Sequence, residues 1–131
     1  MPLRISLKAG ERLIVGGAVL RNGQSRCDLL VENDVPILRG KEVISLDEAT
    51  TPCRRILFAI QLMYVDADHN AEHQKLYWQL VREVVEASPS TKALLTEMSE
   101  RIGAGEYYQA LKLGRKLIAY EEDLISHAAH R

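Results

Sequence analysis

The sequence predicts an α+β protein, with a small N-terminal antiparallel β-sheet followed by a C-terminal bundle of three to four helices. Two observations predict this class. Before residue 50, apolar residues alternate with polar ones or come in short runs broken by glycine, as in short strands. After residue 50, they recur every three or four residues, as on one face of amphipathic helices. We therefore expect an antiparallel β module over residues 1–48 and a helical module over residues 49–131.

The central element is a helix expected over residues 50–65. Thr51 followed by Pro52 is typical of a helix N-terminus, because threonine caps the first turn and the N–H that proline lacks would be unpaired there. Apolar side chains then cover nearly every face, which indicates burial on most sides.

Five short strands are expected before this helix. Asn22-Gly23 is a strong hairpin signal, and Gly16-Gly17 should break or bulge the second strand. Pro36 suits a strand at the edge of a sheet. The expected strands cover residues 3–8, 12–20, 26–32, 35–38 and 43–46.

Capping and breaking residues divide the second half into further helices. Asp68 or Asn70 can cap the helix that follows the central one. Ser88-Pro89 should start the next helix, with serine as the N-cap and proline at the first helical position. Residues 103–105, Gly-Ala-Gly, should close that helix before the last one. Short loops between these helices favour antiparallel packing.

Composition excludes several classes of protein. The 131 residues carry a net charge of −1 and contain no targeting or membrane-spanning segment, so we expect a cytoplasmic protein. Cys27 and Cys53 are isolated, which is typical of reduced cytoplasmic thiols. Residues 1–45 hold seven basic and five acidic side chains, and five of those bases are arginine, which suits contacts with phosphates and base edges.

One face of the predicted sheet is the best candidate for a binding site. Arg4 should point away from Leu3 and Ile5, onto an exposed basic face that could contact RNA phosphates. Residues 1–45 contain no aromatic side chain, which argues against a single-strand binder that stacks bases on aromatic rings and leaves arginine and backbone hydrogen bonding to read RNA. A solvated strand face is the alternative. The candidate RNA-binding residues are Arg4, Lys8, Arg12, Arg21, Arg39 and Lys41.

Two other groups of side chains could carry function. His69 and His73 lie four residues apart beside Asp66, and on a continuous helix they could hold a metal, although a polar corner between helices explains them as well. The tyrosines Tyr107, Tyr108 and Tyr120 are candidate contacts for a protein partner, or simply the edge of a helical core.

Catalytic signatures are missing from the sequence, which contains no nucleophile elbow, P-loop or dinucleotide fingerprint. We therefore expect a protein that is not an enzyme and needs no cofactor or metal. A metal-dependent enzyme built on the two histidines is the low-ranking alternative.

The order of segments resembles the FlbT family of bacterial flagellum biosynthesis regulators. The resemblance rests on LRISLKAGERLIVGGAVLRNG, NDVPILRGKEVI and ATTPCRRILFAIQLMYVD, and it covers nearly the whole chain. It implies a cytoplasmic post-transcriptional regulator that associates with the 5′ untranslated leader of flagellin mRNA and promotes its decay. A small flagellar protein, FlaF, is the implied functional partner or antagonist. The sign of regulation stays open, because some members of the family favour flagellin production.

Residues 1–46 also resemble the carbon storage regulator CsrA, a small β protein that binds mRNA leaders. Gly10-Glu11 match a turn of that family, and Asn33 matches its second turn. Lys8 falls on the second base of an Arg-Arg pair in the first strand. Arg39 falls on the arginine that contacts RNA in the last strand.

The sequence departs from the CsrA pattern at Leu7, at Leu38 and by one extra residue within 39–43. Where the resemblance holds, it implies that Lys8 and Arg39 lie close together on one edge, within one chain or across a homo-oligomer. The sequence thus leaves two hypotheses. One is a direct reader of the flagellin mRNA leader. The other is an adaptor or chaperone that binds flagellin or a FlaF-type protein through its helices and acts on mRNA indirectly, with no membrane contact in either case.

Overall fold

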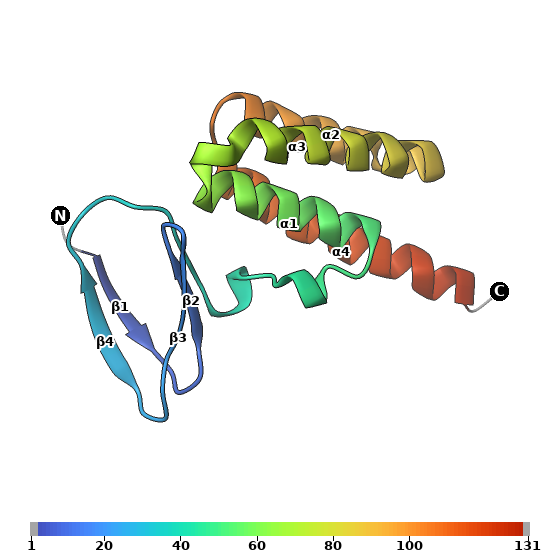
Figure 1. The fold of residues 1–131 in the computed structure, drawn as a ribbon. Helices are drawn as coiled ribbons and strands as arrows, with labels where there is room; N and C mark the ends of the chain where they lie inside the picture. Colours follow the sequence, from blue (N-terminus) through green and yellow to red (C-terminus); the bar gives the residue numbers. More distant parts are fainter. Residues whose placement is uncertain (1–2, 130–131) are drawn as a thin grey trace. The chain divides into compact units, whose positions relative to one another are not determined.

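The computed structural model describes residues 3–129 and confirms the α+β class (Figure 1). Among these residues, five strands precede four α-helices. The chain divides into two compact units, Met1–Val43 and Ile44–Arg131. We call them the strand unit and the helical unit.

The strand unit contains two antiparallel sheets instead of the single sheet expected from the sequence. The smaller sheet pairs β1 (Leu3–Leu7) with β4 (Cys27–Val31). The larger has the order β3-β2-β5, with β2 (Arg12–Val15) between β3 (Ala18–Arg21) and β5 (Ile37–Arg39). The edge position expected for the strand after Pro36 is confirmed, because β5 pairs with β2 alone in the described sheets.

The predicted Asn22-Gly23 hairpin is wrong, because the tight turn lies at Gly16-Gly17. Val15 pairs with Ala18, so these two glycines form a two-residue loop, and Gly16 has the positive φ of 58° that such a turn favours. Asn22 instead lies where the chain crosses between the two sheets.

Alternation along the strands builds the core of the strand unit. Ile5 and Leu7 of β1 and Leu13 of β2 are buried and form one cluster, which aliphatic side chains and Cys27 surround. The surrounding residues are Val15, Cys27, Val31 and Ile37. The pleat therefore turns the polar residues between them, such as Ser6, to the outer faces.

The helical unit is a bundle in which α1 (Pro52–Val65) packs against both α2 (Asn70–Ala87) and α4 (Tyr107–Ala129). The remaining helix, α3 (Lys92–Gly103), packs against α4. Four short 3₁₀ segments complete the described structure, at Gly40–Glu42, Leu46–Glu48, Ala67–His69 and Pro89–Thr91. None of the described helices is long and apolar enough to cross a membrane.

The expected cap of α1 is confirmed, since the Thr51 side chain accepts a hydrogen bond from the Arg54 N–H at 3.2 Å and Pro52 is the first helical residue. A second cap comes from α4. One Glu121 carboxylate oxygen accepts from the Thr51 hydroxyl, and the other accepts from the Cys53 N–H at 3.1 Å. Most of the apolar side chains around α1 are buried as expected, and Ile56 and Ile60 are fully buried.

Three local expectations in this half are wrong. Residues 43–46 form no strand, because the Ile44 N–H and C=O bind the buried side chain of Gln61 at 2.9 and 2.8 Å. Neither Asp68 nor Asn70 caps α2, whose N-cap position is His69. Ser88 makes no side-chain cap, and Pro89 opens a 3₁₀ turn from which α3 continues.

Candidate nucleic-acid interface

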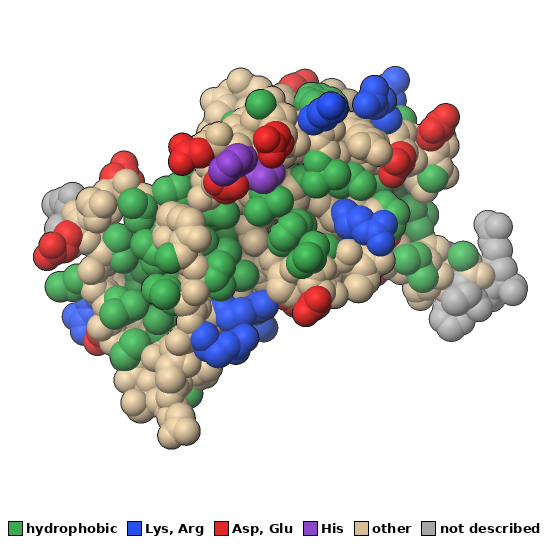
Figure 2. Space-filling model, viewed as in Figure 1, with side chains coloured by type: hydrophobic (Ala, Val, Ile, Leu, Met, Phe, Trp, Pro, Cys, Tyr) green, Lys and Arg blue, Asp and Glu red, His purple; other side chains and the backbone are tan. Residues whose placement is uncertain are grey.

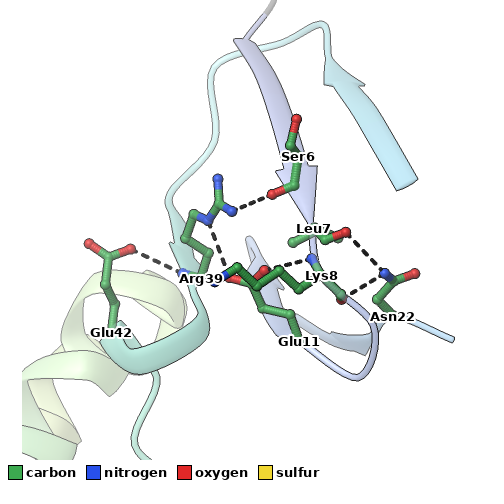
Figure 3. Close-up of polar contacts among 7 residues, drawn as sticks. All are labelled: Ser6, Leu7, Lys8, Glu11, Asn22, Arg39 and Glu42. Atoms are coloured by element: carbon green, nitrogen blue, oxygen red, sulfur yellow. Dashed lines mark hydrogen bonds and ion pairs between the residues drawn. The ribbon is translucent and has the colours of Figure 1, made fainter. Parts of the chain in front are cut away.

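A partly buried carboxylate organises one end of the strand unit (Figure 3). Glu11 lies in the turn after β1, and its side chain is 17% exposed. One of its oxygens accepts from the Lys8 N–H at 2.9 Å, and the other from the Arg39 Nε at 3.4 Å. The backbone hydrogen bond from Lys8 and the Arg39 guanidinium lower the pKa of Glu11 below its ordinary value. We call Lys8, Glu11 and Arg39 the Glu11 cluster.

Arg39 joins three segments through this cluster. Its Nη2 donates to the Ser6 carbonyl of β1, and its own N–H donates to the Glu42 carboxylate at 3.1 Å. The side chain is nevertheless 40% exposed. Figure 3 shows one terminal nitrogen of Arg39 directed away from both Ser6 and Glu11. The guanidinium is thus held in place while part of its donor set faces solvent.

Gly40 is fitted to the same cluster. Its φ is +54°, and a Cβ built on it would lie 2.7 Å from a Glu11 carboxylate oxygen. Any side chain here would strain the backbone and push the carboxylate that orients Arg39.

Asn22 fixes the neighbouring strand ends. Its amide nitrogen donates to the carbonyls of Leu7, Lys8 and Ser25 at 3.3, 2.8 and 3.0 Å. The Asn22 side chain therefore takes the place of strand-to-strand hydrogen bonds at the point where the chain passes from one sheet to the other.

Four of the six candidate RNA-binding residues have structural partners in addition to their charge. Arg4 forms an ion pair with Asp28 at 2.8 Å, although its side chain remains 72% exposed. Arg12 donates to the Val43 carbonyl at 3.2 Å, and Arg21 donates to the Gly10 carbonyl at 3.0 Å. Arg39 belongs to the Glu11 cluster. These four side chains hold the unit together as well as contributing positive charge.

Lys8 and Lys41 differ from the arginines. Both residues are exposed, and within the described residues neither side chain has a hydrogen bond or an ion pair. Lys8 adjoins Arg39 through Glu11, and Lys41 lies two residues beyond Arg39 in the 3₁₀ turn. Lys8, Arg39 and Lys41, which we call the basic edge, all keep donors that face solvent.

Two residues of this site were not singled out as functional from the sequence. The sequence predicts Glu11 only as part of a turn, and no pattern in it marks Gly40.

Comparison with known proteins places the chain in a family. Residues 3–125 match the family described as Flagellar protein FlbT. The chain belongs to the FlbT family. The match covers both units and therefore includes the basic edge and nearly all of the helical bundle.

Curated relatives within the FlbT family match over most of their lengths. A "Probable flagellum biosynthesis repressor protein FlbT" of Caulobacter sp. (strain K31) is 40% identical over 134 residues, covering 98% of this chain and 100% of the relative. The protein of that name from Rhodopseudomonas palustris (strain TIE-1) is 40% identical over 126 residues, covering 96% and 99%. The "Flagellum biosynthesis repressor protein FlbT" of Caulobacter vibrioides (strain ATCC 19089 / CIP 103742 / CB 15) is 36% identical over 134 residues, covering 98% and 93%. No solved structure matches the chain.

The tyrosines considered as partner contacts of this FlbT-family chain all have intramolecular partners. Tyr107 accepts a hydrogen bond from the Asn70 amide at 3.3 Å. Tyr108 packs against Tyr64 with ring centroids 6.3 Å apart and carries the Lys112 ammonium over its ring. Tyr120 donates to the Ser90 hydroxyl at 2.6 Å. Of the three, Tyr120 is the most exposed, at 36%.

The histidine pair of this FlbT-family chain meets on one carboxylate. Asp66 at the end of α1 accepts from His69 Nδ1 at 3.1 Å and contacts His73 Nε2 at 2.9 Å. Hydrogen bonds from both rings lower the pKa of Asp66, and the hydrogen bond to Asp66 raises the pKa of His69. Asp66 thereby ties the end of α1 to the start of α2.

This arrangement predicts a pH-dependent stability. A raised His69 pKa contributes stability below its ordinary value of about 6.5, and the contribution is lost as pH rises through the folded value. A lowered Asp66 pKa contributes above about 3.8 and is lost as pH falls through the folded value. We expect Asp66→Asn to lower the melting temperature most between about pH 4.5 and 6.5, and least above about pH 8. Melting curves of both proteins from pH 4.5 to 8.5 measure this, and a constant difference would contradict it.

Proposed function

We propose that this chain regulates flagellum biosynthesis after transcription, by binding the 5′ untranslated leader of flagellin mRNA through the basic edge. The single observation that supports this site best is that it combines two lysine side chains exposed to solvent with one arginine held in a fixed orientation. Within the described residues, the side chains of Lys8 and Lys41 make no hydrogen bond or ion pair, and Arg39 is oriented by Glu11 while part of it faces solvent. Oriented cations on a rigid strand end are what contacts with phosphate require.

The names of the relatives support the biological half of the proposal. They are called repressors of flagellum biosynthesis, so repression by occlusion of the leader or by recruitment of the decay machinery is the mode we propose. The chain would act without chemistry of its own. Cys53 is unsuited to be a nucleophile, because burial and the neighbouring Glu121 raise its pKa to about 12.

The first experiment is fluorescence anisotropy of the purified protein with a labelled flagellin leader RNA and a scrambled RNA of the same length. Titrations run at two salt concentrations, because phosphate contacts make affinity depend on salt. We expect tight, salt-sensitive binding that prefers the leader. Equal binding of the two RNAs, or none, would contradict a direct reader.

Within this proposal, the double variant Lys8→Ala/Lys41→Ala should bind the leader about tenfold more weakly near physiological salt. The slope of log affinity against log salt should become shallower by about 1.4, since each contact with a single strand contributes about 0.7. The matched control is Lys75→Ala/Lys92→Ala, which removes two exposed lysines from the helices. A strand-unit variant that binds like the control would remove the basic edge from the mechanism.

An adaptor function is the second candidate, and one observation favours it. The helical unit contains a cavity of about 390 Å³ near the N-terminus of α1. Apolar side chains such as Val84 and Leu124 line it, and the carboxylates of Glu83 and Glu121 lie beside them. Such a cavity suits an apolar anchor next to a basic residue on a protein partner such as flagellin or a FlaF-type protein. Co-purification with such a partner that survives RNase treatment would favour the adaptor.

A further inference from the structure

The strand unit exposes large apolar side chains, and four of them lie on β3 and β4. Val19 and Leu20 of β3 are 69% and 46% exposed, and Leu29 and Leu30 of β4 are 38% and 66% exposed. Figure 2 shows hydrophobic side chains gathered over this part of the molecule. Scattered exposed leucines need no explanation, but four on two short strands mark an interaction surface.

These two strands also have open backbone edges. β3 pairs with β2 alone and β4 with β1 alone in the described sheets. By contrast, the carbonyls of Ser6 and Leu7 on β1 accept hydrogen bonds from the side chains of Arg39 and Asn22. The β1 end of the smaller sheet is thus partly closed by side chains, whereas β3 and β4 offer unpaired backbone groups that can accept another strand.

We propose that β3 of one copy of this chain pairs antiparallel with β4 of a second copy, and that the two copies exchange this contact reciprocally. One register matches the side chains of both strands. It places Val19 opposite Leu30, Leu20 opposite Leu29, and Arg21 opposite Asp28. The two most exposed aliphatic side chains then face each other, and the one cation meets the one anion.

The pleat agrees with this register. Leu20 pairs with Leu13 and Leu29 pairs with Ile5, so both point to the side of the core cluster. The new pair Leu20–Leu29 therefore extends the apolar core across the β3–β4 contact between the two copies. A slip by one residue would set a core-facing side chain against an outward-facing one, which fixes the register.

A second copy fits these edges better than an unrelated partner, because one chain carries both complementary halves. Within one chain, β3 and β4 belong to different sheets and share no ladder. Two copies related by a two-fold axis satisfy both edges at once and leave neither free for further growth. Asp28 already accepts from Arg4 and Ser6, but its side chain is 48% exposed and has room for Arg21.

The test measures the mass of the full chain by size-exclusion chromatography with light scattering, at up to about 100 μM, where a dimer with Kd near 1 μM is almost fully formed. We expect the wild type to be a dimer. Val19→Lys and Leu30→Glu, each alone, change both joints of the dimer and should weaken it about a hundredfold, so that at about 10 μM the variants are mostly monomeric while the wild type is mostly dimeric. The matched control is Ile125→Lys, at a 56% exposed aliphatic position on α4, which should remain dimeric.

Mixing the two strand variants separates a lost contact from a damaged fold. In the mixture, one joint carries Lys at position 19 against Glu at position 30, and the other joint is wild type. We expect the mixture to recover the dimer, seen as a heterodimer by native mass spectrometry. A wild type that stays monomeric, a mixture that stays monomeric, or a control that dissociates as readily as the strand variants would each overturn the proposal.

Discussion

Replacing Gly40 by alanine should lower the free energy of opening of the strand unit by about 2–4 kcal/mol. Two effects add. A residue with a Cβ held at the φ of +54° costs about 1–2 kcal/mol. The new Cβ would also meet the Glu11 carboxylate at 2.7 Å and displace it from Arg39. Hydrogen exchange of the β1 and β5 amides, followed by mass spectrometry, measures this opening free energy.

Two controls separate these effects. Gly10 also has a positive φ, of 71°, but a Cβ there would meet nothing within 4 Å. Gly10→Ala therefore measures only the cost of placing a residue with a Cβ at positive φ. Gly40→Ala in a Glu11→Ala background measures the cost of positive φ at residue 40 without the contact to the Glu11 carboxylate. We expect Gly40→Ala to be more damaging than Gly10→Ala, and the difference to shrink once Glu11 is removed. Equal effects of the two glycine changes would show that contact with Glu11 plays no part.

Replacing Gln61 by leucine should lower the free energy of unfolding of the helical unit by about 2–6 kcal/mol. Gln61 is 4% exposed, and its amide binds both the N–H and the C=O of Ile44. Leucine fits a buried helix face but leaves both backbone groups without partners, at about 1–3 kcal/mol for each group that stays buried. Urea unfolding followed by the fluorescence of Trp78, the single tryptophan, measures the change.

The matched control is Gln79→Leu on α2, which makes the same substitution at an exposed position. We expect a change within about 0.5 kcal/mol there. If Gln61→Leu were as mild as Gln79→Leu, the link between Ile44 and α1 would not contribute to stability.

Local signals predicted the elements better than their pairing. Thr51-Pro52 marks the start of α1 because the cap lies within four residues of the chain. Strand pairing depends on distant partners, as when β1 pairs with β4 across about twenty intervening residues. Asn22-Gly23 is a hairpin signal in isolation, but here the Asn22 amide serves three carbonyls, and the tight turn forms elsewhere.

The candidate site was predictable in its charges but not in its contacts. Alternation correctly put Arg4 on an exposed face, because period and burial are read from neighbouring residues. That Arg12 and Arg21 donate to backbone carbonyls could not be predicted, since every residue carries a carbonyl and only the fold selects one. The orienting role of Glu11 depends on Arg39, 28 residues away, and was hidden for the same reason.

The Glu121 cap of α1 has a consequence for synthesis on the ribosome. The hydrogen bond from Thr51 to Glu121 spans 70 residues, so the first helix emerges long before the residue that completes its N-terminus. At roughly 5–20 residues per second, that delay is about 4–14 s. The strand unit closes all of its own ladders within the first 43 residues and needs no such wait. A nascent chain therefore contains every strand pairing and every residue of the basic edge while its helical half is still being translated.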